Sequence, residues 1–295
     1  MELNRCIDCN GVGQTLDFAF PLERCNSCKL VFASRWTSVL TEDHSSYYQA
    51  RITWPIESFL PELTLSSLAK TLDHLSRVAP GAKLLDVGCG EGILVHVANT
   101  KGWNAQGIDR SPSAINIART ILNSQCTTAD FFEIDGKFDV ITMIETIEHV
   151  PHPSKFFQRA KEVLAPGGIL YLTTPNFSSL SRRLLRDSWS AIGGDHISYF
   201  EPNILRTKVA LEGFIPLRIR TKNIAEPTLR KILHRDAPLL RPATELTSGT
   251  CPETNALRAF AEHNRVGRVA KSVTNSVLNW SNLGDTIEAI FKVSL

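Results

Sequence analysis

The sequence lacks any apolar run of about 18 residues, the length that a membrane-spanning helix requires. Its longest apolar stretches have the length of strands. The first five residues, Met1–Arg5, begin no apolar run either, so no secretory signal is predicted. These absences lead us to expect a cytoplasmic protein without a membrane span, in which cysteines stay reduced.

The sequence also lacks a strong excess of charge of either sign. Its 295 residues include 32 lysines and arginines and 30 aspartates and glutamates, for a formal net charge of +2. A protein that binds nucleic acid by neutralising phosphates usually carries a larger basic excess, so nucleic acid is not predicted as a partner.

The length predicts about two domains. It does not fix the oligomeric state, and a homodimer is one of the states allowed.

Cysteine is scarce but is concentrated near the N-terminus. Two pairs, Cys6–Cys9 and Cys25–Cys28, are separated by fifteen residues. This spacing is typical of a structural zinc site with four thiolate ligands, because each short turn presents two sulfurs together. Two disulfides or a redox-active pair are the alternatives, and the expected reducing compartment disfavours both. Three further cysteines, Cys89, Cys126 and Cys251, are far apart in sequence and are predicted to be reduced.

The rest of the chain alternates between short apolar segments and segments of helical periodicity, which predicts a parallel sheet with helices on both faces. We expect a zinc-binding module over residues 1–40, a helical linker or lid over 41–80, and an α/β domain over 81–295 with a helical insertion at about 223–284. The expected strands are Lys83–Val87, Asn104–Ile108, Phe138–Ile144, Ile169–Thr174, Pro216–Thr221 and Thr286–Val293. The expected helices are Ile93–Lys101, Pro112–Asn123, Ser154–Leu164, Pro202–Glu212 and Leu257–Leu278, and a turn at 165–168 is expected to end the third of them.

Two features outside the expected sheet have alternative interpretations. Arg258, Arg265 and Arg268 in the insertion could bind phosphate, but charged residues at helical spacing more often form a solvated helix face. Tyr47 and Tyr48 could form a lid over a ligand or could be packing residues.

A glycine-rich turn, Asp86-Val87-Gly88-Cys89-Gly90-Glu91-Gly92, follows the first expected strand and opens a helix. The glycines allow a tight turn and let a ligand approach bare backbone, and the helix N-terminus offers unpaired amides. Glycines alone would also fit a dinucleotide-binding domain. Asp109 ends the second strand, where a carboxylate can bind ribose hydroxyls, and Asp130-Phe131 follows where an adenine could be held.

This set of residues resembles the class I S-adenosylmethionine-dependent methyltransferases over roughly residues 81–221 and the final strand. The resemblance implies a Rossmann-like, seven-stranded methyltransferase sheet. It also implies that Gly88, Gly90 and Gly92 pack against the methionine part of the cofactor and that Asp109 binds the ribose. Asp130 and Phe131 would then contact the adenine, and Asp86 would lie near the ammonium group. If Tyr48 forms a lid rather than packing in the core, it would cover this cofactor.

The segment after the third strand carries Glu145, Glu148 and His149. In a helical first turn these side chains share one face, at positions i, i+3 and i+4. They could hold Mg²⁺ or another divalent cation that lowers the pKa of an acceptor hydroxyl, which makes Glu148 and His149 candidate catalytic residues. The run resembles the metal-binding segment of ubiquinone-pathway catechol O-methyltransferases and of small-RNA 2'-O-methyltransferases. The Glu-His dipeptide also resembles that of methyltransferases without a metal, and Glu145 could instead contact the cofactor amine.

A later loop, Gly193–Phe200, places glycines beside His196. Imidazole titrates near neutrality, so His196 could be a general base or a fourth ligand of the divalent cation. The alternative is a histidine that only caps the helix expected from Pro202.

Together these features favour a methyltransferase that acts on a small-molecule acceptor, with O-methylation in specialised-metabolite or glycan biosynthesis as the leading function. A sugar C-methyltransferase with a histidine base, an RNA methyltransferase and a non-catalytic zinc-mediated interaction protein are the alternatives, in falling order.

Overall fold

The computed structural model describes residues 5–34, 48, 51–224, 228 and 265–294. Tyr47, Cys251, Arg258 and most of the predicted insertion lie outside these residues. The chain divides into two compact units. Unit 1 comprises Met1–Leu40, Thr174–Leu205 and Ile219–Glu288, and unit 2 comprises Thr41–Thr173, Arg206–Arg218 and Ala289–Leu295.

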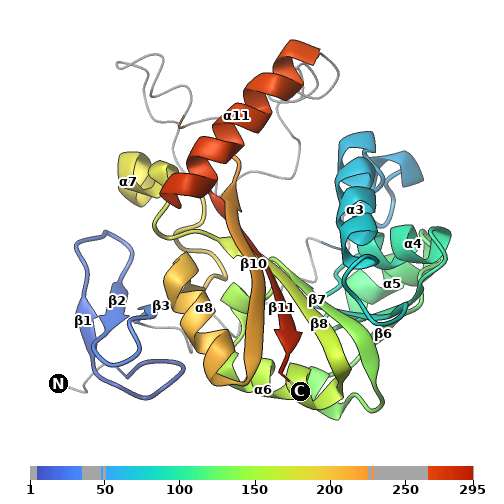
Figure 1. Ribbon diagram of the computed structural model, residues 1–295, viewed down its shortest axis with the longest axis horizontal. Coiled ribbons are helices and arrows are strands. Elements are labelled where there is room, and N and C mark those ends of the chain that lie inside the picture. The colour runs from blue at the N-terminus through green and yellow to red at the C-terminus, as the bar shows by residue number, and fades with distance from the viewer. Residues whose placement is uncertain (1–4, 35–47, 49–50, 225–227, 229–264, 295) are drawn as a thin grey trace. The chain divides into compact units, whose positions relative to one another are not determined.

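A seven-stranded sheet forms the centre of the described α/β fold (Figure 1). Its order is β10-β11-β8-β7-β4-β5-β6, so the predicted seven-stranded fold is confirmed. The strands are β4 (Lys83–Val87), β5 (Asn104–Asp109), β6 (Cys126–Thr128), β7 (Phe138–Ile144), β8 (Leu164–Pro175), β10 (Phe214–Lys222) and β11 (Thr286–Val293). The six predicted strands are all present. The three-residue β6 was missed, because Cys-Thr-Thr is too short to show a strand pattern.

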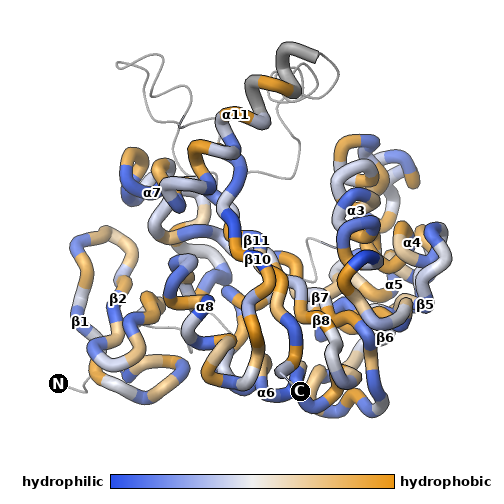
Figure 2. The backbone as a smooth tube through the Cα atoms, in the orientation of Figure 1, coloured by the Kyte–Doolittle hydropathy of each residue, from blue (hydrophilic) through white to orange (hydrophobic). Residues whose placement is uncertain are grey.

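The direction of the chain across this sheet reverses at β4. From β4 the chain adds β5 and then β6 in parallel on one side, and it returns to add β7 and then β8 in parallel on the other. Hydrophobic residues line β7 and β8 (Figure 2), as expected for strands covered on both faces. In such a sheet ligands bind beyond the carboxyl ends of the strands, where the strand order reverses. The fold therefore directs attention to the residues that follow β4, β5 and β7.

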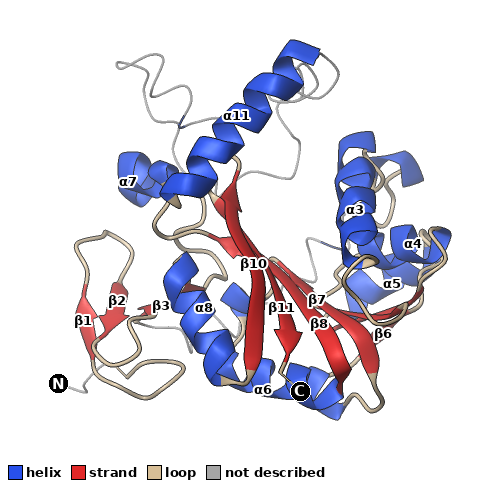
Figure 3. Ribbon diagram, in the orientation of Figure 1, coloured by secondary structure: helices blue, strands red, loops and turns tan. Residues whose placement is uncertain are grey.

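Helices pack beside these strands (Figure 3). Helix α4 (Ile93–Thr100) packs against β5 and α3 (Glu62–Leu75) against α4, while α5 (Pro112–Thr120) covers β5 and β6. The remaining α-helices with described bounds are α6 (Pro153–Val163), α7 (Leu180–Leu185), α8 (Pro202–Leu211) and α11 (Arg265–Ser281). None of the helices in the described residues is long and apolar enough to cross a membrane.

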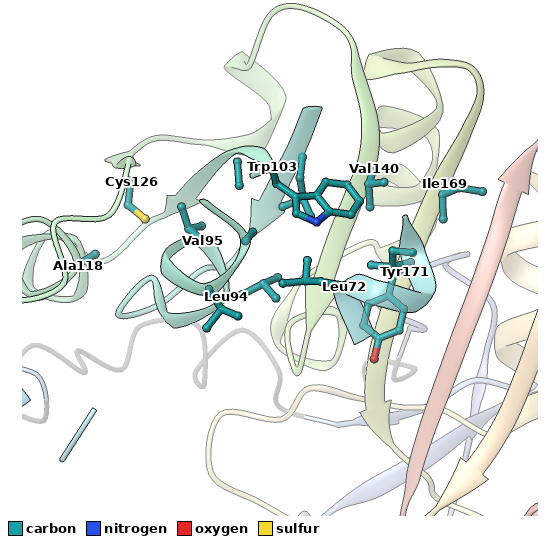
Figure 4. Close-up of a cluster of buried hydrophobic side chains, with 14 of the residues drawn as sticks. Leu72, Leu94, Val95, Trp103, Ala118, Cys126, Val140, Ile169 and Tyr171 are labelled. Atoms are coloured by element: carbon teal, nitrogen blue, oxygen red, sulfur yellow. The ribbon is translucent and has the colours of Figure 1, made fainter. Parts of the chain in front are cut away.

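A buried apolar cluster joins α3, α4 and the sheet (Figure 4). Leu72 of α3, Leu94 of α4 and Val140 of β7 belong to it, together with Trp103, whose indole lies among the labelled side chains. Burial of each large aliphatic side chain stabilises the fold by roughly 1.5–3 kcal/mol. This cluster fixes α4, and with it the glycine turn that precedes α4.

One predicted boundary is wrong. The turn at 165–168 was expected to separate a helix from the next strand, but α6 already ends at Val163 and β8 begins at Leu164. The pairing with β7 moves from Phe138–Leu164 to Val140–Ile169, so residues 165–168 form a bulge inside β8. Gly167 makes the bulge possible because its φ of +72° lies in the left-handed region.

Within the described residues, unit 1 contains a second, smaller sheet, and its strand order is β1-β2-β3-β9. Strands β1 (Gly13–Thr15), β2 (Leu22–Cys25) and β3 (Val31–Ala33) form an antiparallel meander. Its fourth strand is β9 (Ser198–Tyr199), which pairs with β3 in antiparallel register. The N-terminal cysteine segment and the loop that contains His196 therefore belong to one hydrogen-bonded sheet.

Candidate active site

The glycine turn lies at the carboxyl end of β4, and its three glycines have distinct roles. Gly88, Gly90 and Gly92 all have positive φ, of +71°, +51° and +75°. A Cβ atom at Gly88 would lie 2.6 Å from Thr146 Cγ2, and one at Gly92 would lie 2.9 Å from Ala118 Cβ. At Gly90 the described residues leave the backbone open, with Tyr48 Oη at 4.0 Å. Gly88 and Gly92 are required by packing, whereas Gly90 offers bare backbone to a ligand.

Asp109 holds this turn from the neighbouring strand. The parallel register places Val87 opposite Ile108, so the turn after β4 lies beside the end of β5. Gly90 N donates to Asp109 Oδ2 at 2.9 Å, and Ser111 N donates to Asp109 Oδ1 at 2.8 Å. Each carboxylate oxygen keeps further acceptor capacity. The Asp109 carboxylate thus orders the turn and can also accept hydrogen bonds from a ligand.

Asp86 lies beneath the turn in a buried position. The hydroxyl of Thr142, on β7, donates to Asp86 Oδ1 at 2.6 Å. Burial raises the pKa of Asp86 from 3.8 to about 7, the negative charge of Asp109 adds to the rise, and the hydrogen bond from Thr142 opposes it. A cationic group bound nearby would favour the ionised form of this carboxyl group.

The segment after β6 contains the predicted adenine contacts. Asp130 caps a short 3-10 helix, η2 (Phe131–Glu133), and its Oδ1 accepts a hydrogen bond from Phe132 N at 2.9 Å. Phe131 is buried against Phe156 of α6, with ring centroids 5.8 Å apart. Its neighbour Phe132, which the sequence did not single out, is 45% exposed. Because successive aromatics carry no signal for which ring is buried, only the structure distinguishes them.

The predicted helical face of Glu145, Glu148 and His149 does not form. Glu145 has a φ of +49°, outside any helix, and the 3-10 helix η3 covers only Ile147–His149. The Thr173 hydroxyl donates to Glu145 Oε1 at 2.8 Å, and Glu145 N donates to Thr173 O. The left-handed backbone places Glu145 against β8. Glu145 therefore does not share a helical face with Glu148 and His149. Glu148 is 1% exposed, and its Oε1 lies 4.0 Å from His149 Nε2.

His196 lies in unit 1, in a loop ordered by Tyr199. The Tyr199 hydroxyl donates to His196 O at 3.2 Å and accepts from Gly193 N at 3.1 Å. Burial raises the pKa of Tyr199 above its usual range, so the phenol keeps the proton that it donates. His196 Nδ1 lies 2.9 Å from Ala191 O. Since a carbonyl only accepts, Nδ1 is the donor in this hydrogen bond.

The four N-terminal cysteines converge on one point of unit 1. The sulfurs of Cys6, Cys9, Cys25 and Cys28 all lie within 4.8 Å of one another. In both turns the residue after the cysteine pair has a left-handed backbone, with a φ of 59° at Asn10 and 63° at Lys29. Four soft sulfur donors at this separation fit a tetrahedral zinc ion.

A family model described as a methyltransferase domain matches residues 60–214, which is more than half of the chain. The chain belongs to this methyltransferase family. The matched residues include the glycine turn, Asp109, Glu145 and the Glu148–His149 pair.

Relatives and solved structures agree with this assignment. The ubiquinone biosynthesis O-methyltransferase of Actinobacillus pleuropneumoniae serotype 7 is 36% identical over 163 residues, which are 49% of this chain and 67% of that protein. The protein of the same name from Paraburkholderia phymatum is 33% identical, over 41% of this chain and 54% of its own length. A solved S-adenosylmethionine-dependent methyltransferase from Archaeoglobus fulgidus has a TM-score of 0.50 at 18% identity, over 78% of this chain and 93% of that one, and thus shares the fold. The protein is therefore a methyltransferase by family, with the fold of a solved S-adenosylmethionine-dependent methyltransferase.

The buried Asp86 makes stability depend on pH. Because its folded pKa of about 7 lies above 3.8, its contribution to the free energy of unfolding is fully present below pH 4 and is lost as pH rises through 7. The whole loss is on the order of 4 kcal/mol. We expect Asp86→Asn to remove this fall, measured by urea unfolding at several pH values between 4 and 8.

Thr142→Val serves as the matched variant. It removes the hydrogen bond that favours the ionised carboxyl group, so the fall in stability should extend to higher pH than in the wild type. Identical pH profiles for the wild type and Asp86→Asn would contradict the assignment of this titration to Asp86.

Proposed function

We propose that this enzyme transfers the methyl group of S-adenosylmethionine to an oxygen atom of a small-molecule acceptor, in specialised-metabolite or glycan biosynthesis in the cytoplasm. The observation that carries the proposal is the turn that Asp109 holds open at Gly90, where the strand order of the sheet reverses. The O-methyltransferase relatives support oxygen as the methylated atom.

The residues of this turn fit the proposed cofactor. Gly90 presents bare backbone, and Asp109 supplies carboxylate oxygens for ribose hydroxyls. Asp86 supplies a buried negative charge for the ammonium group, and Glu145 a second carboxylate. We assign the adenine contacts to Asp130 and its aromatic neighbours, Phe131 and Phe132. When bound, S-adenosylmethionine supplies an electrophilic methyl group.

The protein must also take one proton from the acceptor hydroxyl. We propose His196 as the general base, because histidine is the side chain that most often transfers protons in catalysis and the contact between Nδ1 and Ala191 O fixes the ring. The Tyr199 hydroxyl and the Ala191 carbonyl fix the loop and the ring, so the base is oriented before the acceptor binds. Glu148 and His149 are the second candidates, either for the proton or as ligands of a divalent cation.

A second candidate function is C-methylation of a keto sugar with His196 as the base. It is favoured by the pairing of β3 with β9, which ties the histidine loop to the cysteine segment. The two functions differ in the bond that forms, to oxygen or to carbon, and product analysis separates them.

Cofactor binding should depend on Asp109. We expect Asp109→Ala to weaken binding of S-adenosylhomocysteine roughly 10- to 100-fold, because a charge-assisted hydrogen bond contributes about 1.5–3 kcal/mol. Isothermal titration calorimetry measures the change. Asp139→Ala is the control, since Asp139 Oδ2 accepts from Lys83 N at the opposite end of β4. Equal losses in both variants, or none in Asp109→Ala, would contradict the assignment.

Methyl transfer itself should give an O-methyl product. We expect isotope-labelled S-adenosylmethionine and a panel of hydroxyl-bearing acceptors to yield it, with His196→Asn lowering kcat by about 100-fold or more. Nuclear magnetic resonance identifies the new bond, and a new carbon–carbon bond would favour the keto-sugar function.

The same assay after EDTA treatment, with Mg²⁺ restored, tests the divalent cation. Turnover that ignores the chelator removes Glu148 and His149 as cation ligands.

We also propose that Cys6, Cys9, Cys25 and Cys28 bind a structural zinc ion. We expect Cys25→Ser to release one zinc per chain, measured by elemental mass spectrometry, because three thiolates do not close the tetrahedron. Since β3 pairs with β9, amide hydrogen exchange should also rise at Ser198 and Tyr199. Cys126→Ser, on β6 of unit 2, is the control that keeps its zinc. A folded Cys25→Ser protein with unchanged exchange and no zinc in the wild type would refute the site.

A further inference from the structure

The turn that carries Gly90 is held by an ion pair that the proposed function does not use. Arg51, which precedes α3, donates through Nε and Nη2 to the two carboxylate oxygens of Glu91, and the Nη2–Oε2 distance is 2.9 Å. Both side chains are largely buried, with 11% and 9% of their surface exposed. A bidentate pair of this kind has a fixed geometry, because the guanidinium fork matches the carboxylate.

Aromatic rings fix the arginine in place. The guanidinium carbon of Arg51 lies 4.5 Å from the ring centroid of Trp54 and 5.1 Å from that of Phe59. Phe59 is 1% exposed and belongs to a buried cluster with Ile117 of α5, against which Tyr48 and Trp54 pack. The segment from Arg51 to Leu60 is thus anchored on the same helix layer that supports the turn.

The ion pair acts on the residue next to the open glycine. Glu91 stands between Gly90 and Gly92, two glycines in the left-handed region. The Gly90 amide is held by Asp109 on one side, and the Glu91 carboxylate is held by Arg51 on the other. Tyr48 Oη lies on the open side of Gly90, where a ligand would approach. Two neighbouring residues of a turn with high backbone freedom are therefore restrained by charged groups from different elements.

We propose that Arg51 is a positioning residue that retains the cofactor. Its pair with Glu91 fixes the turn and keeps the 51–60 segment with Tyr48 beside Gly90, so that the pair must loosen before the cofactor leaves. The proposal rests on cofactor binding at the turn and adds a residue that lies outside the family match. Arg51 acts on the turn through the carboxylate of Glu91, so its effect falls on the rate of dissociation more than on the chemistry.

The dissociation rate of S-adenosylhomocysteine tests the proposal. Stopped-flow displacement on the full chain measures it for the wild type, Glu91→Gln and Arg51→Met. We expect both variants to release the ligand roughly tenfold faster, which corresponds to about 1.4 kcal/mol, and to change kcat at saturating cofactor by a smaller factor. Arg51→Lys should be intermediate, because it keeps the charge and loses the fork. Asp73→Asn is the control, since it breaks an ion pair with Lys101 away from the turn.

The outcomes separate this inference from the proposed function. A wild type that binds no S-adenosylhomocysteine defeats the proposed function. A wild type that binds, with variants that release the ligand at the wild-type rate, overturns the role of Arg51 alone. A lower thermal midpoint with an unchanged dissociation rate also overturns it, because the pair would then only stabilise the fold. A lysine variant that is no slower than the methionine variant contradicts the proposal as well.

Discussion

The parallel pairing of β4 with β5 is the constraint on which the candidate cofactor site depends. It places the end of each strand beside the other, so that Asp109 reaches the amide of Gly90. The glycine turn has few side chains of its own to hold it. Its order comes from Asp109 at the end of β5, from the packing of α5 and β6 that excludes a side chain at Gly92, and from the Arg51–Glu91 pair. Each of these restraints comes from a different part of the sequence.

Burial disfavours the ionised form of Asp86 at this turn. Asp86 and Asp109 bring two carboxylates close to one another, and the pKa of the buried one rises to about 7. Ionising a buried carboxyl group beside a second negative charge costs folding free energy, and a bound cation can recover part of that cost. This arrangement suits a ligand with an ammonium and a sulfonium group, and it explains why two acids surround a turn that needs glycine for steric reasons.

One sheet of unit 1 connects the N-terminal cysteine segment with the loop that contains His196. The second cysteine turn, Cys25–Cys28, connects β2 to β3, and β3 in turn pairs with β9, which follows His196 in the chain. In the region that the structure describes, Tyr199 lies in β9 and also orders the backbone of the histidine loop. The N-terminal segment can therefore influence a loop that lies more than 160 residues later in the chain. Nothing in the local sequence of either segment indicates this pairing.

Six strands of the seven-stranded sheet, the glycine turn and the acid at the end of β5 could be predicted from the sequence, because apolar periodicity and glycine spacing are local signals. The bulge at 165–168 and the left-handed Glu145 were missed, since both depend on how β7 and β8 align. Arg51 was also missed, because an ion pair between residues 40 positions apart leaves no pattern in either segment. Only the tertiary structure decided which phenylalanine after β6 is exposed and which strand completes the N-terminal sheet. Those outcomes depend on packing and hydrogen bonds between distant segments, which a local pattern does not encode.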